Sequence, residues 1–192
     1  MGLKSTAGNA SRKAAASDLA QRILASTSKG NRGPAILALE DGTVFYGRAC
    51  GASGTVTGEA CFNTSLEGYF EVLTDPSYAG QIVTMTYPQI GNYGIDPADV
   101  QSAYPGDARR QAASPALRAL VVHDLCATPS NWRSALSVPD YLEQQGVVSI
   151  EGVDTRALVR HLRDHGAQKA IVSTEVFDLD ELGALLDEAP SL

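Results

Sequence analysis

Short apolar segments alternate with turns that contain glycine and proline from residue 34 onward, and this alternation restricts the chain to a fold with a substantial sheet. Residues 35–40 and 43–47 flank Asp41-Gly42, a typical hairpin turn, so they are expected to pair as strands. Residues 81–86 are rich in β-branched and apolar side chains, which predicts a buried strand. Further strands are expected at 59–63, 118–125, 147–150 and 170–173.

Helical features concentrate in the second half of the chain. Helices are expected at 137–146, 154–165 and 178–187. The first ends at Gly146, and the second starts at Asp154, whose carboxylate suits a helix N-terminus. Residues 66–73 fit either a strand or a short helix. Loops are expected at 74–80, 87–94 and 95–114. The predicted fold class is therefore α+β.

The charges divide the chain into two parts. Residues 1–33 carry 6 basic side chains and 1 acidic one, whereas residues 34–192 carry 9 basic and 21 acidic ones. An acidic body argues against a nucleic-acid surface, which needs clustered lysines and arginines. Neither a membrane helix nor a secretory signal is expected, because no apolar stretch is long enough. The 3 cysteines are too few for a disulfide framework and favour a reducing compartment, so a cytoplasmic location is expected.

Residues 1–33 contain no aromatic side chain and are rich in Ala, Ser, Gly, Lys and Arg, so we expect a disordered extension. Two alternatives stay open, a mitochondrial transit peptide and N-myristoylation at Gly2. The remainder, residues 34–192, is expected to form one domain.

The sequence contains no recognisable nucleophilic site. An activated cysteine or serine stands on a tight, glycine-flanked turn and is paired with a histidine. No such turn surrounds Cys50, Cys61 or Cys126, and these residues are interpreted as small apolar side chains.

Histidines and carboxylates give equally weak signals for catalysis. His161 and His165 share a face of one expected helix, but they lack a third metal ligand, and the neighbouring Arg160 and Arg163 favour an exposed basic face. A general acid–base pair is conceivable among Glu59, Glu67, Glu71 and Asp75. Solvated positions are the simpler interpretation, because nothing in the sequence shows that these carboxylates converge.

Hydroxyls, amides, glycines and tyrosines gather in the loops that follow the expected strands. The segments are 63–65, 68–69, 74–78, 87–88 and 92–94. Loops of this composition serve recognition more often than packing, so the sequence predicts a binding surface rather than an active site.

The same loops, in the same order, resemble the N-terminal domain of the small subunit of carbamoyl-phosphate synthase. The resemblance is carried by Phe62-Asn63-Thr64-Ser65, Gly68-Tyr69, Thr74-Asp75-Pro76-Ser77-Tyr78, Tyr87-Pro88-Gln89-Ile90-Gly91-Asn92-Tyr93-Gly94 and Ile150-Glu151-Gly152-Val153-Asp154-Thr155-Arg156. It extends over about residues 34–175, and the run from 62 to 94 is specific.

The resemblance implies a part in an enzyme complex. The family's enzyme makes carbamoyl phosphate from glutamine, bicarbonate and ATP for arginine and pyrimidine biosynthesis. Its small subunit hydrolyses glutamine to ammonia, which passes through a tunnel to a large subunit that uses ATP and Mg. The implied fold of this domain is a three-layer swivelling β/β/α arrangement. It packs on the large subunit and adjoins a class I glutamine amidotransferase domain with a Cys-His-Glu triad.

Ser77 is the one site residue that the resemblance assigns to this chain, as a contact to glutamine bound between the two domains. No catalytic residue, cofactor or metal of its own is expected, and neither nucleic acid nor membrane is an expected partner. Without the amidotransferase domain the chain by itself is expected to be inactive. The exposed face formed by Arg156, Arg160 and Arg163 is expected to meet the large subunit. The alternative is a stand-alone, non-catalytic binding module for the large subunit or for a separate glutaminase domain.

Overall fold

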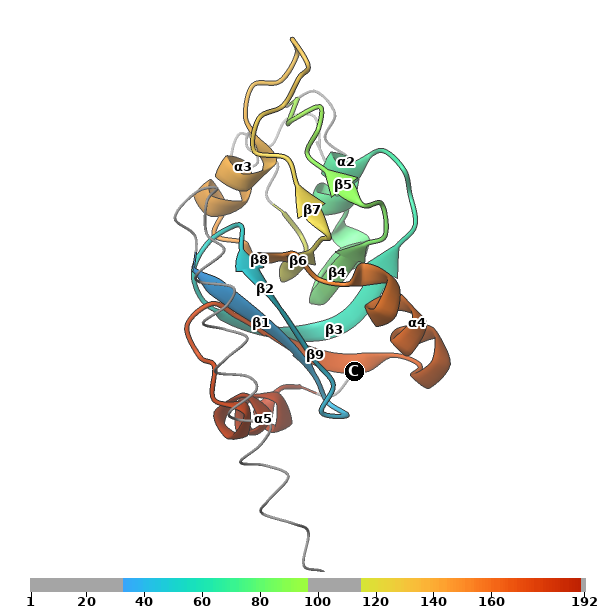
Figure 1. Ribbon diagram of the computed structural model, residues 1–192, viewed down its shortest axis with the longest axis vertical. Coiled ribbons are helices and arrows are strands. Elements are labelled where there is room, and N and C mark those ends of the chain that lie inside the picture. Colours follow the sequence, from blue (N-terminus) through green and yellow to red (C-terminus); the bar gives the residue numbers. More distant parts are fainter. Residues whose placement is uncertain (1–32, 97–114, 191–192) are drawn as a thin grey trace, which may run out of the picture.

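The computed structural model describes residues 33–96 and 115–190, which are drawn in colour in Figure 1. The predicted extension at 1–33, apart from Gly33, and most of the predicted loop at 95–114 lie outside the described residues. Within the described ranges, no helix combines the length and the apolar character that crossing a bilayer requires.

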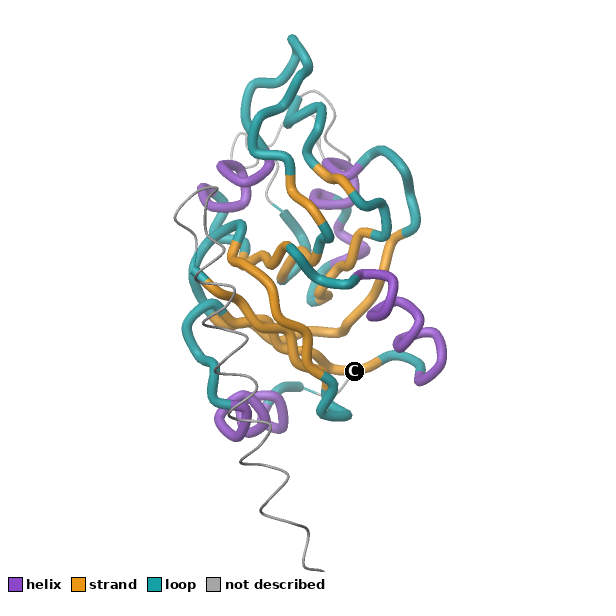
Figure 2. The backbone as a smooth tube through the Cα atoms, viewed as in Figure 1, coloured by secondary structure: helices purple, strands orange, loops and turns teal. Residues whose placement is uncertain are grey.

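Seven of the described strands close into a barrel in the order β1-β2-β8-β6-β4-β3-β9 (Figures 1 and 2). They are β1 (Pro34–Leu39), β2 (Val44–Ala49), β3 (Thr55–Asn63), β4 (Gln81–Met85), β6 (Ala119–Val121), β8 (Val148–Glu151) and β9 (Gln168–Ser173). As predicted, β1 and β2 form an antiparallel hairpin, with Leu37 opposite Phe45. Strands and helices together confirm the α+β class, whereas the closure into a barrel is a feature that the sequence did not predict.

Parallel pairing in one part of the barrel brings several loops to one edge. The neighbouring pairs β3–β4, β4–β6 and β6–β8 are all parallel, so the carboxyl ends of these strands lie together. The segment 118–125, predicted as one strand, is divided, because the chain leaves the barrel after β6 and continues as β7 (Asp124–Leu125). β7 pairs with β5 (Gln89–Ile90), a short strand inside the predicted loop 87–94.

The helices are α2 (Tyr69–Thr74), α3 (Val138–Gln144), α4 (Thr155–His165) and α5 (Leu179–Glu188), with the 3-10 helix η1 (Pro76–Tyr78) before β4. Three helices begin within one residue of their predicted starts at 137, 154 and 178, whereas η1 lies in a predicted loop. The carboxylate of Asp154 accepts a hydrogen bond of 2.9 Å from the Ala157 amide and so caps α4. The ambiguous segment 66–73 forms a helix from Tyr69 onward.

Strand β4 shows that the barrel wall is buried on both faces, as expected for residues 81–86. Ile82 belongs to an apolar cluster with Ile150 of β8 and Leu158 of α4. Its neighbour Val83 belongs to a second cluster with Leu142 of α3 and other residues of α2 and α3. Successive side chains of a strand point to opposite faces, so β4 lies between the two clusters and packs against both.

Candidate functional site

The turn before β4 presents the hydroxyl of Ser77 to solvent. The carboxylate of Asp75 accepts a hydrogen bond of 2.8 Å from the Ser77 amide and caps η1, while Pro76 occupies the first position of this 3-10 helix. Ser77 itself is exposed, and its hydroxyl makes no hydrogen bond to any described residue. The backbone of this turn is therefore ordered, and its hydroxyl is available to a ligand.

The turn at 63–68, which follows β3, lies against the Ser77 turn. The side-chain amide of Asn63 donates a hydrogen bond of 2.9 Å to the hydroxyl of Tyr78. The carbonyl oxygen of the same side chain accepts a hydrogen bond of 2.7 Å from the Ser65 amide. One residue at the end of a barrel strand thus connects two loops that the sequence predicts to serve recognition.

Tyr93 fixes the other end of the turn at 63–68. Its hydroxyl accepts hydrogen bonds from the amides of Gly68 and Tyr69, at 2.8 and 3.3 Å. The rings of Tyr69 and Tyr93 stack with their centroids 4.1 Å apart, and Tyr69 donates to the Gly94 carbonyl at 2.7 Å. Burial raises the pKa of both phenols, so both stay protonated at physiological pH. The structure therefore brings the segments 63–69, 78 and 92–94 together.

The cysteines show no sign of activation. All 3 are free, and Cys50 is buried, as predicted, whereas Cys61 and Cys126 are only partly buried. Burial, with a further contribution from Glu59, raises the pKa of the Cys61 thiol to about 12, so it stays a thiol. Cys126 donates its thiol hydrogen to the Thr128 carbonyl at 3.2 Å.

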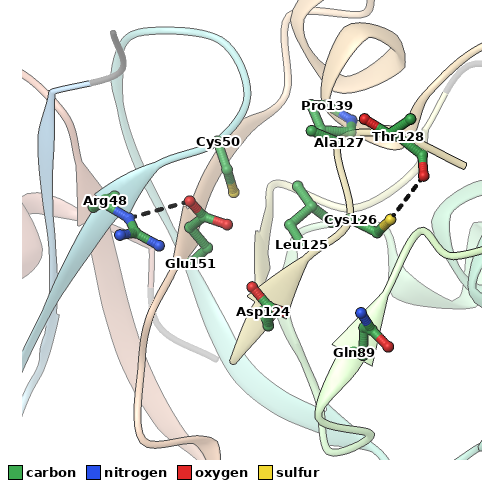
Figure 3. A pocket seen from close by; sticks show the side chains of 10 residues that line it. All are labelled: Arg48, Cys50, Gln89, Asp124, Leu125, Cys126, Ala127, Thr128, Pro139 and Glu151. Atoms are coloured by element: carbon green, nitrogen blue, oxygen red, sulfur yellow. Dashed lines mark hydrogen bonds and ion pairs between the residues drawn. The ribbon is translucent and has the colours of Figure 1, made fainter. Parts of the chain in front are cut away.

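A cavity of about 550 Å³ lies between β2, β7 and the start of α3, and Figure 3 shows its walls. Arg48 pairs with Glu151 at 3.2 Å on one side, and Cys126 lies on another. Ser77 is not among the lining residues, so this cavity is separate from the Ser77 turn.

The carboxylates that the sequence offered as an acid–base group have different partners. Glu59 accepts a hydrogen bond of 2.9 Å from Gln81, and Asp75 is engaged by the Ser77 amide. Glu67 and Glu71 both lie near Tyr93, whose pKa they raise further after burial. Among the described residues, no three His, Cys, Asp or Glu side chains are placed to hold a metal ion.

His161 has a partner that the sequence did not reveal. Its Nε2 lies 2.6 Å from the Asp41 carboxylate in the β1–β2 turn, and its ring stacks on His165 with centroids 4.2 Å apart. The same carboxylate accepts a hydrogen bond of 3.2 Å from Gln168. His161 therefore ties α4 to the hairpin, while Arg160 and Arg163 are exposed, as predicted.

Asp41→Asn is expected to weaken the acid dependence of stability. Burial alone would raise the pKa of Asp41, but hydrogen bonds from Thr43, His161 and Gln168 outweigh it and lower the pKa from 3.8 to about 2. The ionised carboxylate thus stabilises the fold above about pH 4, and this contribution is lost as the pH falls towards 2. Melting temperatures of the two chains, followed by circular dichroism, should differ near neutral pH and converge over that window. A difference that stays constant throughout the window would contradict the role given to Asp41.

The chain matches a known protein family over most of its length. The family model described as carbamoyl-phosphate synthase small chain, CPSase domain, matches residues 37–172. The chain therefore belongs to the carbamoyl-phosphate synthase small-chain family, as the resemblance indicates.

Individual relatives give the same result. The carbamoyl phosphate synthase small chain of Syntrophotalea carbinolica is 54% identical over 158 residues, which are 82% of this chain and 39% of the relative. The small chain of Synechococcus sp. is 48% identical over 86% of this chain and 40% of its own length. The small chain of Thermotoga maritima is 51% identical over 82% of this chain and 38% of its own. The chain thus spans about two fifths of the length of these relatives.

The sequence did not indicate the bond between Asn63 and Tyr78. Asparagine side chains often close local turns, and Asn63 does so by accepting the hydrogen bond from the Ser65 amide. Tyr78, the other partner of Asn63, lies 15 residues later in the sequence. Its contact with Asn63 depends on how η1 packs on the barrel, which no local sequence pattern indicates.

Proposed function

We propose that this chain forms the N-terminal, non-catalytic part of a glutamine-dependent carbamoyl-phosphate synthase small chain, where it docks on the large chain and completes the glutamine cleft. The observation that carries the proposal is the Ser77 hydroxyl, which is exposed and has no described partner on a turn whose backbone is fixed by Asp75. A serine hydroxyl can accept from an ammonium group or donate to a carboxylate, so it suits recognition of an amino acid.

The proposal assigns the nucleophile that attacks glutamine to the amidotransferase domain of a complete small chain. Burial raises the pKa of the Cys61 thiol to about 12, which makes this thiol a poor nucleophile. Ammonia would then pass to the large chain, which supplies ATP and Mg chemistry. A role in arginine and pyrimidine biosynthesis in the cytoplasm belongs to the same proposal, and the three-layer swivelling arrangement stays a prediction.

Two exposed apolar side chains support docking at the loop edge of the barrel. Leu66 is 71% exposed in the turn at 63–68, and Trp132 is 92% exposed in the loop between β7 and α3. Both loops are hydrogen-bonded to the segment around Asn92 and Tyr93, so they are held in place without burying these side chains. Ordered aromatic and apolar side chains of this kind serve as anchors in protein interfaces.

A chimera tests the proposal. Residues 34–175 of this chain would replace the matching part of the Thermotoga maritima small chain, to which this chain is 51% identical, and the product would be combined with the large chain. We expect carbamoyl phosphate synthesis with glutamine and with ammonia. A chimera that binds the large chain and uses ammonia, but gives no glutamine-dependent synthesis, would contradict the proposed role in the glutamine cleft.

Charge reversal on α4 is expected to weaken docking. Arg156, Arg160 and Arg163 are exposed on α4, whereas Leu158 and Leu162 anchor the helix in the core. Replacing the three arginines by glutamate in the complete small chain should raise the Kd for the large chain by about tenfold. This increase should become smaller as the salt concentration rises. Sedimentation or light scattering would measure the Kd. Reversing Asp187 and Glu188, which are exposed on α5, is the matched control. An equal Kd for both variants would contradict an interface at α4.

A further inference from the structure

We propose that Asn63 is a positioning residue for Ser77 and acts through the hydroxyl of Tyr78. The inference rests on the proposed contact between Ser77 and glutamine. It adds that the position of the Ser77 hydroxyl depends on a side chain at the end of β3.

Asn63 is a rigid point of attachment. It is the last residue of β3, where it is the register partner of Met85 in β4. Its backbone carbonyl accepts a hydrogen bond of 3.0 Å from the Thr86 amide, and its side-chain carbonyl accepts one of 2.7 Å from the Ser65 amide. With both carbonyl oxygens engaged, the direction of its amide group toward Tyr78 is fixed.

The Ser77 turn has few hydrogen bonds to the rest of the described structure. The bonds from the Ser77 amide to the Asp75 carboxylate and from the Ala79 amide to the Pro76 carbonyl lie within the turn, so they fix its shape and not its orientation. Two hydrogen bonds connect residues 75–80 to the rest of the described structure. One joins Tyr78 to Asn63 at 2.9 Å, and the other joins the Gly80 carbonyl to the Glu59 amide at 3.3 Å.

The Asn63–Tyr78 bond is therefore the attachment nearest to Ser77. The Glu59–Gly80 bond holds the end of the turn where β4 begins, and Gly80 adopts a left-handed φ of 84° between that bond and Ser77. The ring of Tyr78 packs against the apolar cluster of α2 and α3, so loss of the Asn63 bond would shift the turn and not release it. A shift of the Ser77 hydroxyl by about 1 Å is enough to lose a hydrogen bond to a ligand.

The test uses the complete enzyme with Asn63→Ala, Tyr78→Phe and the double variant. Each single variant should raise the glutamine KM by about tenfold, because each removes the Asn63–Tyr78 hydrogen bond, and Asn63→Ala also removes the bond from the Ser65 amide. The kcat at saturating glutamine and the rate with ammonia should stay within about twofold of the parent enzyme. The double variant should be no worse than the stronger single one, since both changes remove the same bond.

Asn131→Ala is the matched control. The side chain of Asn131 accepts a hydrogen bond of 3.1 Å from the Arg133 amide, so it closes the same kind of turn as Asn63, but on the loop between β7 and α3. This variant loses a comparable bond with no connection to the Ser77 turn, and its glutamine KM should not change.

The outcomes separate this inference from the proposed function. If Ser77→Ala raises the glutamine KM while Asn63→Ala and Tyr78→Phe leave it unchanged, the positioning role is overturned and the role of Ser77 stands. If Ser77→Ala itself has no effect, the proposed function fails. Effects of Asn63→Ala and Tyr78→Phe that add in the double variant, or an equal loss of the ammonia-dependent rate, would also overturn the positioning role.

Discussion

Ser77→Ala should raise the glutamine KM of the complete enzyme by roughly 10–100-fold and leave its ammonia-dependent rate unchanged. The serine hydroxyl is exposed and has no described partner, so removing it breaks no bond of the fold. A hydrogen bond to a charged group contributes about 1.5–3 kcal/mol, and that range sets the expected change in KM. Steady-state rates of carbamoyl phosphate formation with each nitrogen source would measure both effects.

Ser65→Ala is the control for this prediction. Ser65 is exposed on the adjacent turn and takes part there through its backbone amide, which the substitution keeps. Its glutamine KM should match that of the parent enzyme. If Ser77→Ala reduces the glutamine-dependent and ammonia-dependent rates by the same factor, the assignment of Ser77 to glutamine is wrong.

Gly47→Ala should destabilise the chain by about 2–4 kcal/mol. A Cβ at Gly47 would overlap the backbone carbonyl of Glu151 and would lie 2.8 Å from a side-chain carbon of Ile150. Both neighbours belong to β8, and β2 pairs with β8 in the closed barrel. The backbone of β8 therefore cannot move away from an added Cβ without separating these two strands. For a domain of this size the melting temperature should fall by roughly 5–15 °C, which calorimetry would show.

Gly183→Ala is the matched change at an open position. Gly183 lies in α5 with nothing within 4 Å of an added Cβ. Alanine has the higher helix propensity, so this variant should keep or slightly raise the melting temperature. Equal melting temperatures for the Gly47 and Gly183 variants would contradict the close approach of β2 and β8.

Local features of the fold were predictable because a few neighbouring residues determine them. The hairpin at Asp41-Gly42 follows from its turn residues, and the start of α4 follows from Asp154, which binds an amide three residues later. The exposed arginines of α4 follow from helical periodicity. In each case the residues that determine the feature lie only a few positions apart in the sequence.

Features that depend on distant partners were not predictable. The division of 118–125 into β6 and β7 depends on β5, which pairs with β7 from 35 residues earlier in the sequence. The contact between Asp41 and His161 joins residues 120 positions apart. Through this contact His161, which was predicted to lie on an exposed basic face, connects α4 to the β1–β2 turn. For the candidate site, the composition of the loops predicted a binding surface, and the resemblance assigned Ser77, whose contact with glutamine stays a prediction. The Asn63–Tyr78 bond required the packed barrel.

The most direct test of the central claim measures whether glutamine covers position 77. A complete small chain with Ser77→Cys, bound to the large chain, would be labelled briefly with iodoacetamide, and mass spectrometry would follow the labelling rate at that position. A chain with Asp187→Cys, exposed on α5, is the reference. We expect saturating glutamine to slow labelling at position 77 and not at position 187. Equal labelling rates at position 77 with and without glutamine, in an enzyme that still hydrolyses glutamine, would contradict the contact between Ser77 and glutamine.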